Sequence, residues 1–544
     1  MEKDKAKEQS FFTASGIPLK GIYTQEDIAD LNPERDLGTA GTPPFTRGVY
    51  PGMYRTMPWR IRQLTAYGSV EDQRDRIRYA LKHGDPAITM TGDFATSALY
   101  DLDDAAIASR KSDVGLVGAP ILSLRDWEVI LEGIPLDKVY IGALGPPQGQ
   151  PIYFGCYFAL AQNNGISLDR IAGTGFQDMC TCYLAAPFPE QIVPSKALRL
   201  IGDTIEYCVK NTPHVTTGSF SGYNIRECGI SAYQEIAVML ACATTYIDEV
   251  LSRGRLKVDD FAYSIAGGHM SCDRDFFEEI AKFRVMRRMW ARLLRDRYKA
   301  QDPKSMRFRI HVQTSGASLT LHQPMNNVVR VAYQVLAAAL GGVQSMNSDC
   351  YDEAISVPSE EAALLAIRTQ QVAQHEIGIT SVADPLGGSY YIEKLTNDLE
   401  EKALDYLKQI EDRGGFLAAL ESGWLPMEFT KAMLEEEKKA KAGQKKIVGV
   451  NCFQMDVEPF KIKAFNTGSG VWEKEMARLE ALRKERDSRK VAQALGELRR
   501  AAETGQNIME PSIEAARSYV TLGEVGRLWR EIFPIMKEPI ASLW

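Results

Sequence analysis

Short apolar runs alternate with longer amphipathic stretches between residues 46 and 395. The short runs are rich in β-forming or small residues, and most lead into glycine, asparagine or aspartate, as strands that end in loops do. They predict eight strands, which begin near Ile88, Val139, Ile171, Val215, Phe261, Phe308, Val343 and Ser381. Strands and helices that alternate eight times predict an α/β fold of the (β/α)8 TIM-barrel type.

The longer stretches carry apolar residues at helical spacing. Ser69-Val-Glu-Asp72 resembles a capping box, and it predicts a helix that continues to about Lys82. Three further long helices are predicted at Tyr233–Leu251, Asp275–Tyr298 and Asn326–Leu340.

The two ends of the chain differ from this central region. Residues 1–45 contain four prolines and little periodicity, which predicts an extended N-terminal arm. Beyond residue 395 the strand signals fade, so residues 396–544 are predicted to be a mostly helical C-terminal region. Within it, Trp472 to Thr504 is strongly helical and highly charged, and we expect these charges to form a solvated helix face.

Composition restricts the class of protein. The chain has 544 residues, of which 45% are hydrophobic and 25% charged, as in ordinary globular proteins. A net charge of −7 argues against nucleic-acid binding, although local arginines can still attract an anionic small ligand. No apolar run reaches the length of a membrane span, and the charged start lacks a signal-peptide core. We therefore expect a cytoplasmic protein that does not bind membranes.

The nine cysteines are scattered, and Cys180 and Cys182 are the only close pair. They predict buried free thiols and no metal site. The sequence also lacks a Walker loop, a Gly-x-Gly-x-x-Gly motif and a His-Glu-x-x-His motif. In a barrel, residues at the carboxyl ends of the strands carry out the chemistry. This rule selects the segments 89–94, 174–177, 219–224, 266–269, 311–316 and 345–353.

Several motifs follow one another through the chain: Pro44–Arg55, Pro58–Gln63, Ala172–Thr174, Ser221–Tyr223, His311–Gly316, Asn326–Arg330, Tyr351–Ala354, Asp384–Tyr390 and Gly449–Asn451. In this order they resemble the methylmalonyl-CoA mutase family, nearest to its isobutyryl-CoA and 2-hydroxyisobutyryl-CoA mutase type. The resemblance implies a barrel whose axis is threaded by CoA. It also implies an isomerase that uses adenosylcobalamin for radical migration of the carbonyl-thioester group.

The family's cobalamin-binding module carries an Asp-x-His-x-x-Gly motif whose histidine ligates cobalt. None of the six histidines of this chain has an aspartate two residues before it. No cobalamin-binding Rossmann-like domain is therefore expected in this chain. The resemblance then implies a separate small subunit that supplies the lower cobalt ligand, in a heterotetramer or another heteromer.

The resemblance also implies where substrate and cofactor bind. Its substrate-binding positions fall on Tyr50, Met53, Arg60, Arg62, Leu64, Thr89, Thr174, Phe176, Ala186 and Ser345. Its corrin contacts fall on Gly92, Phe94, Ala185, Glu227, Gly316, Glu353 and Ala354. Tyr223 and Gln313 match residues of the family's substrate pocket, and we expect both to be catalytic.

Departures from the family pattern restrict the substrate. Ala186 occupies the position of the arginine that pairs with the carboxylate of methylmalonyl-CoA, and residues 181–187 contain no cation. Leu64 replaces an aromatic residue, and Phe176 replaces a glutamine. A buried carboxylate without a partner would cost several kcal/mol. We therefore expect an uncharged, branched or hydroxylated acyl group rather than methylmalonyl-CoA.

A second departure concerns the thioester carbonyl, which a family histidine hydrogen-bonds. Asn224 occupies that position and can still donate a hydrogen bond. His269, at the end of the next predicted strand, is the alternative donor. Asn224 is favoured because it needs no rearrangement of a loop.

Two other functions remain open at this stage. One is a mutase of a bulkier acyl thioester, for which Ala186 and the glycine-rich segment 143–149 would make room. The other is a non-catalytic paralogue that binds cobalamin or a partner mutase. The missing histidine and two missing phosphate-facing arginines of the family favour the paralogue, whereas the retained Tyr223, Gln313 and Glu353 argue against it.

Overall fold

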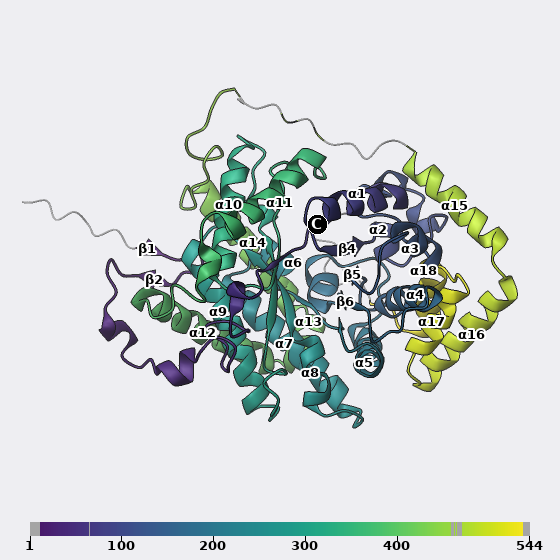
Figure 1. Ribbon diagram of the computed structural model, residues 1–544, viewed down its shortest axis with the longest axis horizontal. Helices are drawn as coiled ribbons and strands as arrows, with labels where there is room; N and C mark the ends of the chain where they lie inside the picture. Colours follow the sequence, from purple (N-terminus) through teal and green to yellow (C-terminus); the bar gives the residue numbers. More distant parts are fainter. Residues whose placement is uncertain (1–10, 65, 458–461, 463, 465–469, 537–544) are drawn as a thin grey trace, which may run out of the picture.

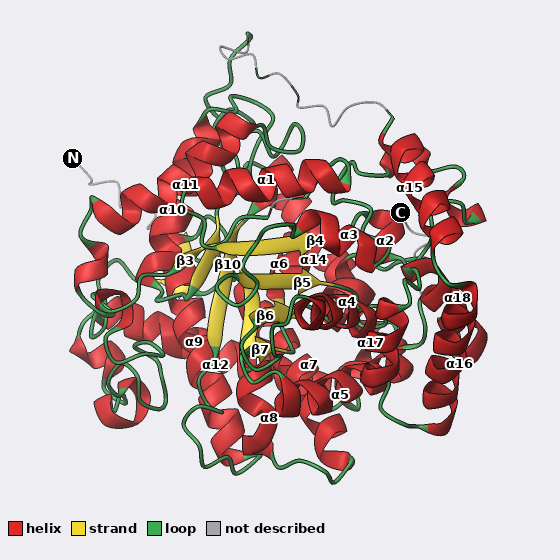
Figure 2. Cartoon of the chain, turned by 45° about the vertical axis from the view of Figure 1, so that its right-hand side comes forward, coloured by secondary structure: helices red, strands yellow, loops and turns green. Residues whose placement is uncertain are grey.

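The computed structural model describes residues 11–64, 66–457, 462, 464 and 470–536. In this part of the chain, two parallel sheets lie at the centre and helices surround them (Figure 2). One sheet has the order β3 (Arg60–Ile61), β11 (Ser345–Asn347), β10 (Arg309–Thr314), β9 (Gly267–Cys272) and β8 (Phe220–Ser221). The other has the order β4 (Ala87–Thr91), β5 (Tyr140–Leu144), β6 (Ala172–Gly175) and β7 (Val215–Thr216). The predicted α/β class with parallel strands is confirmed.

The two sheets adjoin at both edges. On one side the chain leaves β7 at Thr216 and enters β8 at Phe220, so only three residues separate the two sheets. On the other side, the residues after β3 reach the strand β4. There Arg62 Nε donates to Thr89 Oγ1 at 3.0 Å, and Gln63 N donates to Asp85 Oδ2 at 2.7 Å.

Helices alternate with the strands of both sheets (Figure 1). They are α1 (Val70–Lys82), α2 (Phe94–Ser97), α3 (Leu124–Ile130), α4 (Gln150–Asn163), α5 (Pro194–Asn211), α6 (Gly222–Glu227), α7 (Ala232–Ser252), α8 (Val258–Ile265), α9 (Phe276–Asp296), α10 (Asn326–Leu340) and α11 (Glu360–His375). The predicted long helices are confirmed as α1, α7, α9 and α10. The capping box of α1 is present too, because Ser69 Oγ accepts from Asp72 N while Asp72 accepts from Ser69 N.

The remaining helices follow β11 and α11 in the chain. They are α12 (Tyr390–Glu411), α13 (Gly415–Glu421), α14 (Trp424–Lys441), α15 (Val471–Glu485), α16 (Ser488–Thr504), α17 (Met509–Arg517) and α18 (Leu522–Ile532). Helix α12 packs on α7 and α9, whereas α17 packs on α4 at the other side of the molecule (Figure 1). Ahead of the sheets, β1 (Phe11–Phe12) and β2 (Pro18–Leu19) form a short antiparallel pair.

Two of the eight predicted strands are wrong. Phe261 lies in α8, where Val258, Phe261, Ala262 and Ile265 follow helical spacing and are buried. The strand of this region is β9, which the sequence concealed because it contains two glycines and no β-branched residue. Ser381 ends a single 3₁₀ turn, Ile379–Ser381, after a left-handed Gly378.

Besides β9, the short strands β3 and β8 were missed. Strand β3 is the clearer example. It is only two residues long, and it pairs in parallel with β11, where Ser345 is in register with Arg60. Such a short strand has no alternation of its own, so its position depends on the partner strand.

The predicted helical stretch from Trp472 to Thr504 is interrupted. Arg486 has an extended backbone, and Asp487 then caps the N-terminus of α16 by accepting from Arg489 N and Lys490 N. The charged face is only partly solvated, which corrects the expectation from the sequence. Arg486 Nη1 donates to Glu524 Oε2 at 2.7 Å, so this charge ties the C-terminal helices together.

None of the described helices combines the length and the apolar composition that a membrane crossing requires.

Candidate active site

Two cavities lie at opposite ends of the strands. The first has a volume of about 400 Å³, and its lining includes residues at the starts of the strands, among them Arg60, Ala87, Tyr140, Ala172, Gly267, Arg309 and Ser345. The second has a volume of about 630 Å³ and is lined by residues that lie beyond the strand ends, among them Leu64, Ser348, Asp349, Glu353 and Ala354. Strand β10 contributes to both, with His311 in the first cavity and Gln313 in the second.

Small side chains on β4, β5 and β6 make room for the buried side chain of Arg62. Thr89, Gly142 and Thr174 are in register on β4, β5 and β6. A Cβ atom on Gly142 would lie 2.3 Å from Arg62 Nη2, so the glycine makes room for this guanidinium. The buried side chain of Arg62 occupies this space and donates to Thr89 Oγ1 at 3.0 Å.

The first cavity is electropositive. Arg60, Arg62 and Arg309 line it, and its described lining residues include no carboxylate. The guanidinium groups of Arg60 and Arg62 lie 5.3 and 5.6 Å from the ring centroid of Tyr140. Arginines in this arrangement bind phosphate and carbonyl oxygens. Arg309 did not emerge from the sequence as a site residue, because no motif carried it, yet it provides a third cation at this opening.

An aromatic column lies between the two cavities. The rings of Tyr223 and His269 stack with their centroids 5.0 Å apart, and His311 lies 5.0 Å further along. His311 Nδ1 is hydrogen-bonded to Ser345 Oγ at 2.8 Å, and Gln313 Nε2 donates to Tyr223 Oη at 3.0 Å. The structure thus brings together three of the four predicted catalytic residues, and it adds His311, which the motif contained but the sequence did not single out.

Both histidines of this column are neutral at pH 7. Burial, followed by the charge of Arg62, lowers the pKa of His269 to about 3, and the same causes hold the pKa of His311 well below its usual range. Part of each side chain remains accessible, and His311 lines the first cavity. A neutral imidazole can donate or accept a hydrogen bond, but it does not act as an acid at this pH.

Asn224 lies near this column, on α6. Its Oδ1 accepts from Ser221 Oγ at 2.9 Å and from Thr181 Oγ1 at 3.1 Å. These two hydroxyl groups fix the amide and leave its NH₂ group as the donor. Asn224 does not line either of the two cavities as they stand.

Two carboxyl groups, Asp349 and Glu353, line the second cavity, and Glu227 lies close enough to interact with both. Gln313 Nε2 donates to Asp349 Oδ1 at 2.8 Å, and Glu227 accepts from Ser271 Oγ at 3.2 Å. Burial and the neighbouring carboxylates raise the pKa of Asp349 well above its usual value and that of Glu353 to about 7. A Cβ atom on Gly316 would lie 3.2 Å from Tyr223 Oη and 3.4 Å from Asp349 Oδ2, so this glycine borders the same group.

The other predicted residues are distributed around these groups. Tyr50, Met53 and Thr174 line the first cavity. Phe94 is covered by the guanidinium of Arg110, 3.5 Å from its ring centroid, and Gly92 pairs with Ala119. Eleven of the predicted residues line neither of these two cavities: Thr89, Gly92, Phe94, Phe176, Ala185, Ala186, Tyr223, Asn224, Glu227, His269 and Gly316.

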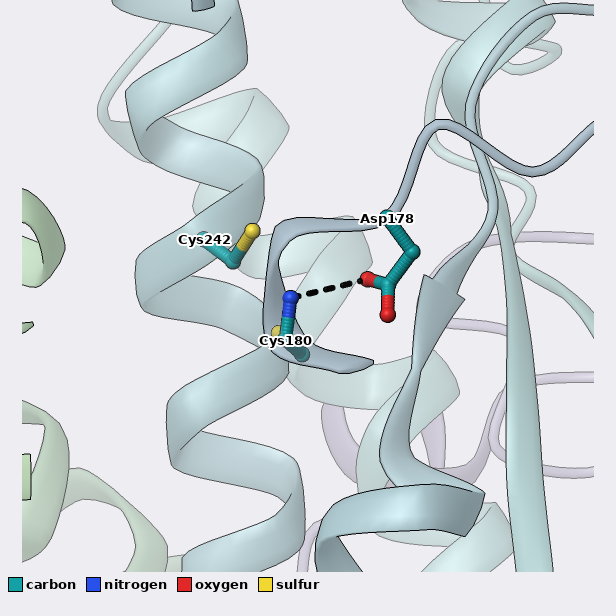
Figure 3. Close-up of side chains that lie close together, drawn as sticks. All are labelled: Asp178, Cys180 and Cys242. Carbon is teal, nitrogen blue, oxygen red and sulfur yellow. Dashed lines mark hydrogen bonds between the residues drawn. The ribbon is translucent and has the colours of Figure 1, made fainter. Parts of the chain in front are cut away.

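A buried cluster supports the loop after β6 (Figure 3). It consists of Asp178, Cys180 and Cys242, whose side-chain ligand atoms all lie within 4.8 Å of one another. The carboxylate of Asp178 accepts backbone N–H groups from Ser221, Cys180 and Thr181 at 3.0, 3.2 and 2.6 Å. Its oxygens are therefore already used to order the loop that leads to Thr181 and Asn224.

Comparison with known proteins identifies the family. Residues 12–534 match the family model described as methylmalonyl-CoA mutase. The chain belongs to the methylmalonyl-CoA mutase family. Members of this family are CoA mutases, which are isomerases, so the protein is an enzyme of that class.

Relatives within the methylmalonyl-CoA mutase family differ in length. The chain is 37% identical over 540 residues to the 2-hydroxyisobutanoyl-CoA mutase large subunit of Aquincola tertiaricarbonis. This alignment covers 99% of this chain and 94% of the relative. It is 35% identical over 514 residues to the methylmalonyl-CoA mutase of Escherichia coli strain K12, covering 94% of this chain and 70% of the relative. The human mitochondrial methylmalonyl-CoA mutase is 32% identical to this chain over 525 residues, and the alignment covers 96% of this chain and 68% of the relative.

Proposed function

We propose that the chain is the large, substrate-binding subunit of an adenosylcobalamin-dependent mutase that rearranges an uncharged acyl-CoA. The observation that carries this proposal is the arrangement of the site. An arginine-lined cavity opens at the starts of the strands, a carboxyl-lined cavity opens at their ends, and Tyr223, His269, His311 and Gln313 lie between them. A ligand that enters at the first cavity can bring its reactive end to the second.

The two sheets, in this proposal, form one closed (β/α)8 barrel over residues 46–395. The three-residue step from β7 to β8 and the hydrogen bonds between the end of β3 and β4 support closure at both edges. Counting β7 and β8 as two parts of one strand gives eight parallel positions around the axis. The arm of residues 1–45 and the helical region 396–544 flank the barrel.

The CoA moiety occupies the first cavity. Its phosphates are anionic, and Arg60, Arg62 and Arg309 offer cations at the opening. The small residues of β4, β5 and β6 make room for Arg62, which lines the first cavity and would meet an extended chain between the sheets. The thioester then lies near Tyr223 and Gln313, where Asn224 or His269 can donate to its carbonyl oxygen.

The residues at the second cavity fit a cobalamin. The edge of a corrin ring carries amide side chains, which need both acceptors and donors. Glu227 and Glu353 supply acceptors here, and Gln313 Oε1 and Asp349 Oδ2 are buried atoms without a partner in the structure. When bound, adenosylcobalamin supplies the radical chemistry, whereas this chain positions the substrate and excludes water.

A separate small subunit supplies the lower cobalt ligand. No histidine in the chain follows an aspartate at the spacing of the Asp-x-His-x-x-Gly motif. The relative from Aquincola tertiaricarbonis is named a large subunit, which supports a division of the same kind here.

The acyl group is uncharged because the segment around Ala186 lacks the cation that would pair with a carboxylate. Residues 181–187 contain none, and Leu64 contributes an apolar surface to the second cavity. The buried Arg76, which lines the second cavity, donates to the carbonyl oxygens of Pro358 and Ser359, and Arg62 is hydrogen-bonded to Thr89. A branched or hydroxylated acyl group fits this environment better than a carboxylate does.

Turnover in a complete mixture tests this function. We expect a mixture of the chain, a small subunit with the Asp-x-His-x-x-Gly motif and adenosylcobalamin to convert isobutyryl-CoA or 2-hydroxyisobutyryl-CoA into its straight-chain isomer. Chromatography with mass detection separates the two isomers. Omission of any one protein or of the cofactor should abolish the product. A complete mixture that converts no branched or hydroxylated acyl-CoA would refute the proposal.

A further inference from the structure

One buried carboxylate joins the loop after β6 to the end of β8. Asp178 is 0% exposed, and its Oδ1 accepts from Ser221 N at 3.0 Å and from Cys180 N at 3.2 Å. Its Oδ2 accepts from Thr181 N at 2.6 Å. Ser221 ends β8, whereas Thr181 follows β6, and these two strands belong to different sheets. The side chain therefore fixes two segments relative to each other that no pairing between their strands connects.

The two segments held in this way carry the hydroxyl groups that aim Asn224. Ser221 Oγ and Thr181 Oγ1 donate to the same atom, Asn224 Oδ1, at 2.9 and 3.1 Å. Two hydroxyls that converge on one oxygen require their backbones to keep a fixed separation. Asp178 maintains that separation, because it accepts the backbone N–H group of each of the two residues.

The loop that carries Asp178 is also held from α7. Tyr246 Oη donates to Gln177 O at 2.8 Å and accepts from Met179 N at 3.1 Å, so it bonds to the chain on both sides of Asp178. Gln177 has a φ of 29°, which is uncommon for a residue other than glycine. The turn that brings Asp178 to β8 therefore depends on bonds from the surrounding structure.

The titratable groups around Asp178 do not include a positive charge among those that face it. Cys180 and Cys182 lie on its own loop, and Cys242 and Tyr246 face it from α7. None of these four side chains can become a cation, so the carboxylate depends on its N–H donors. Burial raises the pKa of Asp178 to about 6, and the hydrogen bonds only partly oppose this. At pH 7 the group is therefore mostly ionised, which is the form that accepts at both oxygens.

We propose that Asp178 is a positioning residue for the mutase reaction, which orients the amide of Asn224 through the two hydroxyl-bearing residues that it holds. Asp178 itself is fully buried and lines neither of the two cavities, so it acts without touching the substrate. The inference rests on the proposed function, in which Asn224 donates to the thioester carbonyl.

A double-mutant cycle tests this role in the complete mixture of chain, small subunit and adenosylcobalamin. Asp178→Asn keeps the shape of the side chain but places an NH₂ group against N–H donors. It should lower kcat about tenfold and leave KM within about twofold, because the lost orientation acts on the transition state. In the Asn224→Ala background the same substitution should lower kcat by less than about twofold, since the group through which it acts is absent. A purely structural role would cost the same factor in both backgrounds.

Asp126→Asn is the matched control for burial and lost hydrogen bonds. Asp126 is also buried, accepts from Leu122 N and Ser123 N at 2.8 Å each, and has a pKa raised by burial to about 6. It caps α3 and holds neither residue that bonds to Asn224. Thermal unfolding should show a comparable loss of stability in the Asp126 and Asp178 variants. Any effect of Asp126→Asn on kcat should be equal with and without the Asn224 amide.

The pH dependence of turnover supplies a test that needs no variant of Asp178. Protonation of its carboxylate replaces an acceptor by an O–H group and weakens the hold on both segments. The ratio of kcat for the unmodified chain to kcat for Asn224→Ala should therefore decline as the pH falls from about 8 to about 5. Taking the ratio removes the titration of other groups that affect both chains equally.

Several results would overturn the inference. They are an equal loss from Asp178→Asn in both backgrounds, or a kcat ratio that stays constant with pH. If Asn224→Ala leaves kcat unchanged, the inference fails while the proposed function stands. If the complete mixture with the unmodified chain gives no product, the proposed function fails and the inference fails with it.

Discussion

Replacing Asn224 by alanine is expected to slow turnover of the acyl-CoA substrate about a hundredfold, since removal of one preorganised donor to a reacting carbonyl costs about 3 kcal/mol. The hydroxyl groups of Ser221 and Thr181 hold Asn224 Oδ1 and thereby aim its NH₂ group. The structure thus contains a donor that is oriented before the substrate arrives. Steady-state kinetics of the complete mixture would measure the effect on kcat.

His269→Ala is the matched comparison for this prediction. His269 stacks on Tyr223 and its Nε2 is buried without a partner, so it is the other available donor. We expect a smaller loss of turnover than for Asn224→Ala, and Thr181→Val should weaken the orientation of Asn224 by only a few-fold. If the order reverses, with His269→Ala at a hundredfold and Asn224→Ala near unity, then His269 holds the carbonyl and the assignment to Asn224 is wrong.

Methylmalonyl-CoA is expected to remain unconverted by a mixture that turns over an uncharged acyl-CoA. Its free carboxylate would lie near Ala186, and residues 181–187 contain no cation. Leaving a charge buried and unpaired costs several kcal/mol, which reduces turnover by at least a thousandfold. Formation of succinyl-CoA, followed by chromatography, measures this directly.

Ala186→Arg serves as the control for substrate charge. It restores a cation at the position where the family has one, so it should increase competitive inhibition by methylmalonyl-CoA and weaken binding of the uncharged substrate. Appreciable succinyl-CoA from the unmodified chain would contradict the prediction. It would also indicate that Arg60 or Arg62 reaches the acyl group.

The sequence predicted those elements whose own residues determine them. Helix α1 begins at the Ser69 capping box, and α10 spans Asn326–Leu340 as its periodicity indicated. Elements whose position depends on partner strands were harder to predict from the sequence. Strand β3 is two residues long and exists through its pairing with β11, and β9 is rich in glycine. Neither carries a periodic signal.

The residues of the candidate site also fall into two groups, those that the sequence located and those that only the structure reveals. Motifs located Tyr223 and Gln313, which the structure places in hydrogen-bond contact. Three contributors were not singled out, because their roles arise from three-dimensional neighbours: Arg309 at the first cavity, His311 in the aromatic column, and Asp349 beside Gln313. The rule on strand ends selected only the segments that contain His311 and Asp349. A carboxyl group that is close to two others in space, such as Asp349, cannot be recognised from a sequence in which Glu227 is more than a hundred residues away.

Retention of adenosylcobalamin during gel filtration tests the account most directly. The chain and the small subunit together should elute with the cofactor in stoichiometric amount, and the chain alone should elute with little or none, because no histidine of the chain has the motif that ligates cobalt. Stoichiometric retention by the isolated chain, with one of its own six histidines bound to cobalt, would contradict it.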